Sequence, residues 1–119
     1  MRNFRELTVW KDGRILVKEV YKLTHLLPDS ERFGLIPQVQ RGAISIPANI
    51  AEGCGKDSEK DFIRFLQISL GSAYELETHF ILCEDLEFLS PEIVQRIIGE
   101  IQILQKKIVA LIKHIKSSH

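Results

Sequence analysis

The sequence of 119 residues has only two cysteines, no long apolar run and no net charge, and each of these scarcities narrows what the protein can be. Cys54 and Cys83 lie outside any CxxC or Cys/His cluster, so neither a disulfide framework nor a zinc site is supported. No apolar stretch reaches the roughly 18 to 20 residues that cross a bilayer, and the charged first residues do not resemble a secretory signal. We therefore expect a cytoplasmic protein without a cofactor or a metal.

The absence of net charge hides an uneven distribution. Sixteen basic residues balance sixteen acidic ones, so the molecule as a whole should not attract nucleic acid. However, residues 1–22 hold six basic and three acidic side chains, and residues 101–119 hold four lysines and no acid. Residues 57–92 hold two basic and nine acidic side chains. Whether the basic segments 1–22 and 101–119 lie close together depends on the fold.

Apolar residues at helical spacing are what the sequence does contain. They recur at alternating gaps of three and four over about residues 5–27, 37–52 and 58–86, and again beyond residue 90. No useful length alternates with the period of two that is typical of strands. The pattern predicts an all-α, antiparallel up-and-down four-helix bundle in which residues 1–119 form a single domain.

Residues that start or stop helices support these boundaries. Pro28 should end the first helix, and Gly53 and Gly55 should end the second after about residue 51 or 52. Ser58 is followed three residues later by an acid, which predicts an N-cap for the third helix. Ser90 and Pro91 predict the cap and first turn of the fourth.

The second helix has apolar residues on two sides, whereas a helix in a monomeric bundle needs only one buried stripe. One side carries Val39, Ala43, Ile46, Ile50 and Gly53. The other carries Ile44, Ala48 and Ala51. This pattern predicts that the helix packs inside its own bundle and also against another subunit.

The stretches FRELTVWKDG, FGLIPQVQRGAISIPANIAEGCGK and FLQISLGSAYELETHFIL resemble a family of four-helix-bundle proteins. That family was first noticed as reading frames inside intervening sequences of bacterial large-subunit ribosomal RNA, and it is sometimes labelled a ribosomal protein. The similarity extends from about Phe4 to Leu89. It implies an antiparallel bundle that assembles as a homopentameric ring, with no established enzymatic activity in the family.

The resemblance also implies kinship with the accessory protein of diversity-generating retroelements, which binds nucleic acid and a reverse transcriptase. The chain departs from the family pattern at one relevant place. Where the family commonly has Gln-x-Arg-Arg-Ala, this sequence has Gln38 to Gly42 with the single basic residue Arg41. The loss of a basic residue weakens any nucleic-acid contact assigned to that helix.

The segment SIPANIAEG places Ser45, Asn49 and Glu52 close to Pro47. Catalysis by Ser45 has little support, because no G-x-S-x-G turn and no nearby histidine are present. The alternative is structural: Pro47 frees the carbonyl of Ala43, and the short polar side chains satisfy this and neighbouring groups. The residues that carry this structural and oligomer signature are Arg41, Ser45, Pro47, Asn49, Glu52 and Gly53.

Two features of the third helix could suggest a ligand site. Glu75 precedes His79 by four positions and Glu77 precedes it by two, so neither matches the Glu-x-x-His spacing of di-metal bundle sites. The small residues at 71–73 could line a cavity. We expect instead that they let the third helix pack closely against the second.

An up-and-down bundle would bring the basic segments together at the end where the chain starts and finishes. The nucleic-acid-binding candidates at that end are Arg2, Arg5, Lys11, Arg14, Lys56, Lys60, Lys106, Lys107, Lys113 and Lys116. The opposite end would carry Glu84, Asp85, Glu87 and Glu92. The first hypothesis is a non-enzymatic ring that binds RNA or DNA, as an accessory to a ribonucleoprotein or retroelement process. The alternative is a protein-protein interaction scaffold with no nucleic-acid role.

Overall fold

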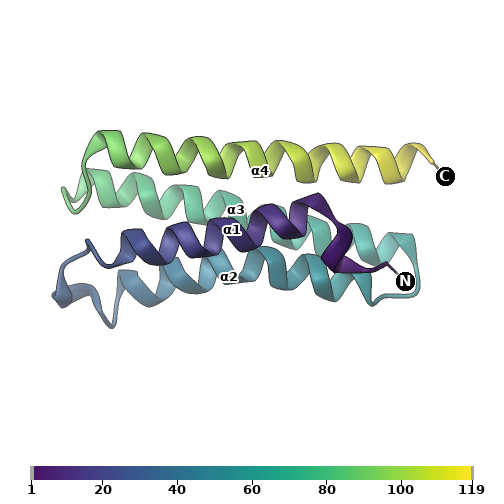
Figure 1. The fold of residues 1–119 in the computed structure, drawn as a ribbon, viewed down its shortest axis with the longest axis horizontal. Coiled ribbons are helices and arrows are strands. Elements are labelled where there is room, and N and C mark those ends of the chain that lie inside the picture. Colours follow the sequence, from purple (N-terminus) through teal and green to yellow (C-terminus); the bar gives the residue numbers. More distant parts are fainter. Residues whose placement is uncertain (1, 119) are drawn as a thin grey trace.

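Four long helices joined by short turns make up residues 2–118, the part of the chain that the structure describes (Figure 1). In the computed structural model these helices are α1 (Thr8–Thr24), α2 (Leu35–Cys54), α3 (Glu59–Asp85) and α4 (Pro91–Ser117). The short 3-10 turns η1 (Phe4–Glu6) and η2 (Asp29–Glu31) precede α1 and α2. Residues 2–118 contain no strand, so the all-α prediction is confirmed.

Successive helices run in opposite directions along a body 47 Å long and 23 by 19 Å across (Figure 1). Each helix packs against the next and α4 packs against α1, which leaves α1 and α3 diagonal to each other. The two chain ends and the α2–α3 junction lie together at one end, which we call the terminal end (Figure 1). The α1–α2 and α3–α4 junctions lie at the other, the far end.

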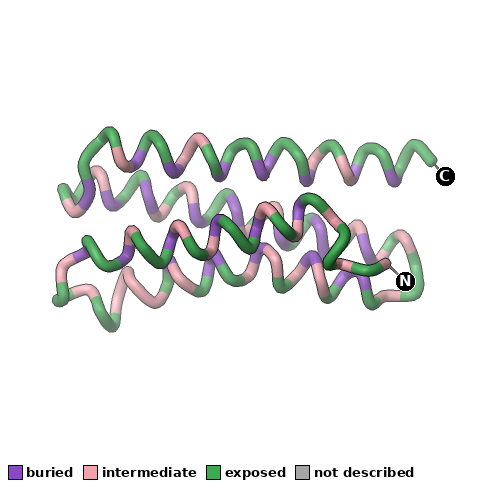
Figure 2. The backbone as a smooth tube through the Cα atoms, viewed as in Figure 1, coloured by how far each residue is buried: buried purple, intermediate pink, exposed green. Residues whose placement is uncertain are grey.

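The starts of α3 and α4 follow from the caps in the sequence. Ser58 Oγ accepts a hydrogen bond from the backbone N–H of Asp61 at 3.1 Å, and Ser90 Oγ accepts one from Ile93 at 3.3 Å. Pro91 occupies the first position of α4. Inward positions recur at helical spacing along all four helices and form one apolar core (Figure 2).

The boundaries of α1 differ from the predicted range of 5–27. Asn3 caps the separate turn η1, so α1 begins only at Thr8. At its other end α1 stops at Thr24, before Pro28, because the backbone tightens. The N–H groups of Leu26 and Leu27 bond carbonyls three residues back, at 2.9 and 3.2 Å.

Of the two glycines predicted to stop the second helix, Gly55 is confirmed as the C-cap of α2, but Gly53 does not stop it, because α2 continues through Cys54. Gly53 is buried inside the helix, where α2 lies close to α3. A Cβ atom at this position would lie 2.8 Å from Phe65 Cβ and 3.1 Å from Phe62 Cδ1. Packing against α3, rather than helix termination, therefore requires a glycine here.

Candidate nucleic-acid interface

The segment around Pro47 forms a polar contact between α2 and α3 and not a nucleophilic site. The Asn49 side-chain amide donates to the Ser45 carbonyl at 2.8 Å and to Ser45 Oγ at 2.9 Å. Ser45 Oγ in turn shares a hydrogen bond of 2.7 Å with Ser72 Oγ on α3. Asn49 and Ser45 thus stabilise the backbone beside Pro47, as predicted, although the carbonyl they satisfy is that of Ser45 and not that of Ala43.

A second hydrogen bond beside Pro47 was not foreseen. Ser69 is fully buried and its hydroxyl donates to the Ile46 carbonyl at 2.9 Å. On the opposite side of α2, Gly13 of α1 is so close that a Cβ atom there would lie 3.4 Å from the Pro47 ring. Pro47 therefore lies where α1, α2 and α3 meet.

The other members of the segment point outward. Arg41 and Glu52 are exposed on α2, and no hydrogen bond or ion pair joins either side chain to another described residue. Gly71, expected at a close helix crossing, is exposed instead, and a Cβ atom there would meet nothing within 4 Å. The close contact that the small residues at 71–73 were predicted to make is carried by Ser72 and the buried Ala73.

The basic candidates occupy two different sides of the bundle, because α1 and α3 are diagonal. Two of the ten, Arg2 and Lys107, form ion pairs within the protein. The guanidinium of Arg2 forms a two-pronged ion pair with Glu59 and lies 4.2 Å above the Phe62 ring, while its backbone N–H donates to the Cys54 carbonyl. The hydrogen bonds from Arg2 to Glu59 raise its pKa further. Arg2 therefore fastens the start of the chain to the α2–α3 junction.

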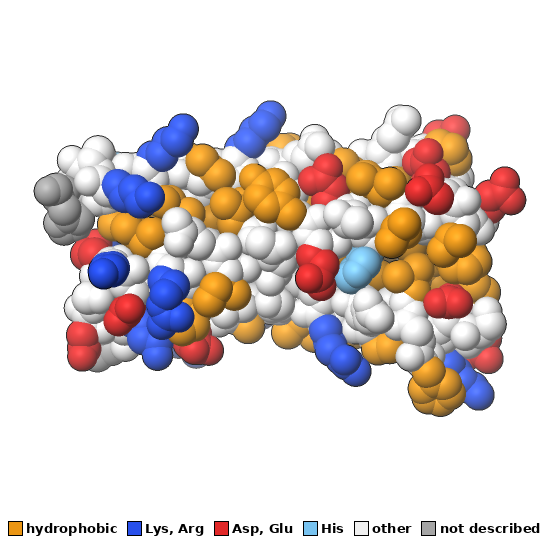
Figure 3. Space-filling view, turned by 180° about the vertical axis from the view of Figure 1, so that it is seen from behind, with side chains coloured by type: hydrophobic (Ala, Val, Ile, Leu, Met, Phe, Trp, Pro, Cys, Tyr) orange, Lys and Arg blue, Asp and Glu red, His pale blue; other side chains and the backbone are white. Residues whose placement is uncertain are grey.

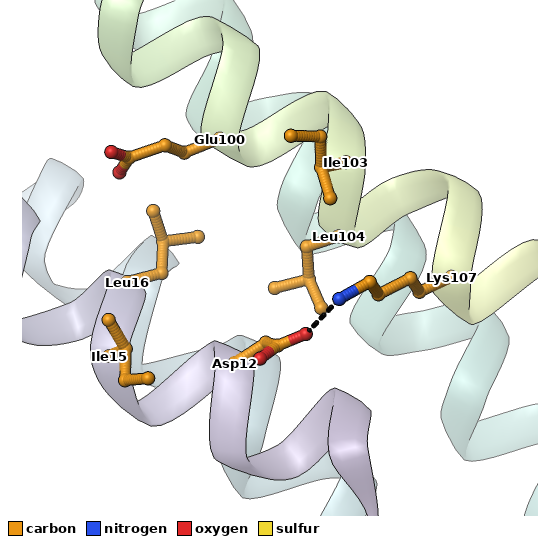
Figure 4. Close-up of a pocket in the computed structure, with 7 residues that line it drawn as sticks. All are labelled: Asp12, Ile15, Leu16, Glu100, Ile103, Leu104 and Lys107. Carbon is orange, nitrogen blue, oxygen red and sulfur yellow. Dashed lines mark hydrogen bonds and ion pairs between the residues drawn. The ribbon is translucent and has the colours of Figure 1, made fainter.

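Lys107 is the second ion-paired candidate, and Lys56 is held against an aromatic ring. Lys107 Nζ donates to Asp12 Oδ2 at 2.7 Å and so ties α4 to α1 (Figure 4). Lys56 is half-buried, and its ammonium group lies 5.1 Å from the centre of the Phe65 ring. These lysines contribute charge to the region but have little freedom to reach a ligand.

Basic residues on α1 form one of the two remaining groups. Lys11 and Arg14 line a surface hollow of about 410 Å³ together with Lys18, which was not among the predicted candidates. The Arg14 guanidinium lies 5.5 Å from the Trp10 ring, and that of Arg5 lies 4.9 Å from the Phe4 ring. Lys11, Arg14 and Lys18 are hereafter the α1 stripe.

The larger group lines a shallow groove between α3 and α4 that consists of two neighbouring hollows of about 520 and 640 Å³. Its basic side chains are Lys60, Arg64, Lys106, Lys113 and Lys116. Tyr74, with 51% of its surface exposed, lines the hollow nearer the middle of the bundle. We call this surface, from Tyr74 to Lys60, the α3–α4 groove.

The acidic residues of the α3–α4 groove are all held by partners. Glu59 pairs with Arg2, and Asp61 pairs with Arg64 at 3.7 Å. Beyond the hollow that Tyr74 lines, the carboxylate of Glu77 accepts hydrogen bonds from the side-chain amides of Gln105 at 2.8 Å and Gln102 at 3.1 Å. No ion pair joins Lys60, Lys106, Lys113 or Lys116 to another residue within 2–118.

Arg64 and Tyr74 were missed although the sequence carries a signal for them. Lys60, Arg64, Gln67, Gly71 and Tyr74 follow one another at gaps of four, three, four and three, so they share one side of α3. That side is polar at the terminal end and finishes with an aromatic ring. The space-filling view shows basic side chains gathered towards the terminal end, with some acidic ones among them, and mainly acidic charges towards the far end (Figure 3).

The described part of the chain shows no metal-binding cluster, no membrane-spanning helix and no reactive cysteine. Within residues 2–118 no three His, Cys, Asp or Glu side chains come together as metal ligands, and no helix is long and apolar enough to span a membrane. Burial raises the pKa of the Cys54 thiol, and it raises that of Cys83 to about 11. Both thiols are therefore poor nucleophiles at neutral pH.

The similarity to known proteins covers the helices that build this surface. The family model described as 23S rRNA-intervening sequence protein matches residues 5–110. The chain belongs to this family. This match confirms the family that was expected from the sequence motifs. It begins within η1 and includes all but the last turns of α4.

A solved structure supports the same conclusion for this intervening sequence protein. It is a protein with unknown function from the S23 ribosomal protein family of Bacteroides thetaiotaomicron. The two sequences are 27% identical, the TM-score is 0.82, and the match covers 89% of this chain and 99% of that one. No curated protein matches the sequence.

Proposed function

We propose that this intervening sequence protein is a non-enzymatic homo-oligomer that binds RNA or DNA through the α3–α4 groove. In this proposal the protein acts as an accessory to a ribonucleoprotein or retroelement process. The observation that carries the proposal is the row of lysines without ion-pair partners among the described residues, formed by Lys60, Lys106, Lys113 and Lys116.

The charge of the groove favours a polyanion even though the chain is neutral. Five basic and two acidic side chains line its two hollows, and both acids are paired with arginines. Each lysine that neutralises a phosphate releases condensed counterions, and this release is a large favourable term in nucleic-acid binding. The acidic far end would repel phosphate, so a bound strand should follow the terminal half of the groove.

Oligomerisation is supported by the side of α2 that the bundle leaves uncovered. Ile44 keeps 43% of its surface exposed, Ala48 is exposed and Ala51 is half-buried. The opposite side of α2, from Val39 to Gly53, is fully buried in the protomer. A second subunit on the exposed side would bury Ile44, and a homopentameric ring would repeat the α3–α4 groove around its axis.

The test is fluorescence anisotropy of a labelled structured RNA and a duplex DNA, titrated with protein at several salt concentrations. Two matched variants separate local contacts from total charge. The groove variant replaces Lys106, Lys113 and Lys116 by alanine, and the stripe variant replaces Lys11, Arg14 and Lys18. Each lowers the formal charge by three.

We expect the slope of log affinity against log salt to fall by about 2.7 on duplex DNA in the groove variant, at 0.9 per lost phosphate contact. The stripe variant should lose much less. Equal losses would show that net charge and not the groove controls binding. Absence of binding by the unmodified protein at low salt would refute the proposal, and a stable monomer in light scattering would refute the homo-oligomer.

A protein scaffold is the second candidate, favoured by the apolar hollow between α1 and α4. The apolar part of this hollow of about 200 Å³ consists of Leu16 and Leu104, with Ile15 and Ile103 exposed by 61% and 56% (Figure 4). Its lining also includes the charged residues Asp12, Glu100 and Lys107. Such a surface suits an apolar segment of a partner protein. Loss of partner binding in an Ile15→Asp variant that still binds nucleic acid would distinguish this role.

A further inference from the structure

We infer that the α3–α4 groove recognises unpaired nucleotides, with the Tyr74 ring as a stacking platform for one base and lysines on either side for the phosphates. The inference rests on the proposed function and narrows its ligand to single-stranded segments of RNA or DNA. Its starting point is Tyr74, which the bundle does not use. Half of its surface is exposed, and its hydroxyl group makes no hydrogen bond to another described residue.

The neighbours of Tyr74 leave room for a flat ligand. Gly71 lies one turn earlier on the same side of α3, where even a Cβ atom would meet nothing within 4 Å. Across the groove, Ala110 of α4 is exposed and has the shortest side chain that α4 places there. The hollow of about 520 Å³ beside the ring is therefore open at the height where a base would stack.

Lysines lie on both sides of this opening. Lys106 and Lys113 line the same hollow as Tyr74 and are seven residues apart on α4, which is two turns or about 10 Å along the helix axis. Both are exposed on the same side of α4. A base on the ring between them would have a cationic group towards each neighbouring phosphate, which is the combination typical of single-strand binding sites.

Glu77 gives the site a direction. Its carboxylate is fixed by Gln102 and Gln105 immediately beyond Tyr74, on the side of the far end. A strand that stacks on Tyr74 should therefore leave it towards Lys113, Lys116 and Lys60. Because the two glutamine amides already donate to Glu77, they are poorly placed to read base edges, and we expect little sequence preference.

A duplex cannot use this platform, since its bases are stacked on one another and paired. The measurement is the affinity of the full chain for a 12-nucleotide oligouridine, an oligodeoxyuridine of the same length and a duplex, all at one salt concentration. Tyr74→Ala should weaken both single strands about 5- to 150-fold, as expected for loss of one stacked base. Tyr74→Phe keeps a ring and should bind within about twofold of the unmodified protein.

The chain offers a matched control in Tyr21, its only other tyrosine, which is exposed on α1. Tyr21→Ala should change no affinity, and Tyr74→Ala should leave duplex affinity unchanged. A 5-iodouridine strand should photocrosslink to the peptide that contains Tyr74. Equal affinities for oligouridine and oligodeoxyuridine of the same length would assign the contact to base and phosphate, whereas a preference for oligouridine would add a contact to the 2′-hydroxyl.

The protein could bind duplex DNA and respond to the groove variant, while Tyr74→Ala leaves its single-strand affinity unchanged. That result would overturn the stacking site and leave the proposed function intact. No binding to any of the three ligands would overturn both. A change of oligomeric mass in Tyr74→Ala, detected by light scattering, would show that the ring belongs to a subunit contact and would also overturn the stacking site.

Discussion

Gly53 allows a sharp test of how closely α2 and α3 approach. In Gly53→Ala, the new methyl group would lie 2.8 Å from Phe65 Cβ and 3.1 Å from Phe62 Cδ1. The Phe65 Cβ atom is fixed to the backbone of α3 and cannot rotate away. The helices must therefore separate slightly near the α2–α3 junction, where Phe62 is almost completely buried.

The expected cost combines two opposing terms. Forcing one extra carbon into a packed core costs about 1 to 3 kcal/mol. Replacing glycine by alanine inside a helix returns about 0.5 to 1 kcal/mol, because the unfolded chain loses freedom. Gly53→Ala should therefore lower the free energy of unfolding by up to about 2.5 kcal/mol.

Gly99 of α4 provides a control of identical chemistry, because a Cβ atom there would meet nothing within 4 Å. Gly99→Ala should raise the free energy of unfolding by about 0.5 to 1 kcal/mol, as expected for a helix interior without steric conflict. The two substitutions should thus have opposite signs.

Urea denaturation followed by circular dichroism measures both variants. All samples need the same protomer concentration, since the stability of an oligomer depends on it. If Gly53→Ala is as stable as Gly99→Ala, the close approach of α2 and α3 at this position is wrong. A normal urea dependence with a lower midpoint would locate the change in the folded state.

Three further outcomes follow from individual contacts. Ser69→Ala removes the buried hydrogen bond to the Ile46 carbonyl and should lower the free energy of unfolding by about 1 kcal/mol in urea denaturation; no change would mean that the carbonyl needs no second donor. Lys107→Ala breaks the exposed pair with Asp12, and calorimetry should show a cost below about 1 kcal/mol; a larger loss would mean that the pair organises the α1–α4 contact. Burial raises the pKa of Cys83 to about 11, whereas an unfolded thiol titrates near pH 8.5. The contribution of this thiol is therefore complete below about pH 8.5 and is lost as the pH rises towards 11. Unfolding free energies between about pH 9 and 11 should fall less steeply in Cys83→Ala than in the unmodified protein; parallel curves would contradict this.

Local sequence signals predicted the fold best where a cap determines the structure. The third and fourth helices start where Ser58 and Ser90 cap them, because these hydroxyl groups bond backbone donors a few residues away. Gly53 shows the limit of such signals. Its helix-breaking tendency is real, but the tertiary contact with Phe65 decides its role, and that contact joins residues whose approach no local pattern reveals.

In the candidate site, too, the sequence predicted what depends on chain order and missed what depends on tertiary contacts. Chain direction in an up-and-down bundle was enough to bring the basic segments to one end. Whether each side chain is available depends on partners far away in sequence, such as Glu59 for Arg2 and Asp12 for Lys107. Tyr74 escaped notice because exposure of an aromatic residue depends on which side of α3 is covered by α2 and α4.

The arrangement of the chain ends has a practical consequence for anyone who labels or fuses this protein. Both ends emerge at the terminal end (Figure 1), so an affinity tag at residue 2 or 118 would hang beside the α3–α4 groove and compete with a ligand. The turn between α3 and α4 is the better attachment site. There Glu87 is exposed and adopts a φ of 61°, a conformation that glycine accepts more easily. A short insertion that also replaces Glu87 by glycine would relieve this strain and carry a fluorophore at the far end of the bundle.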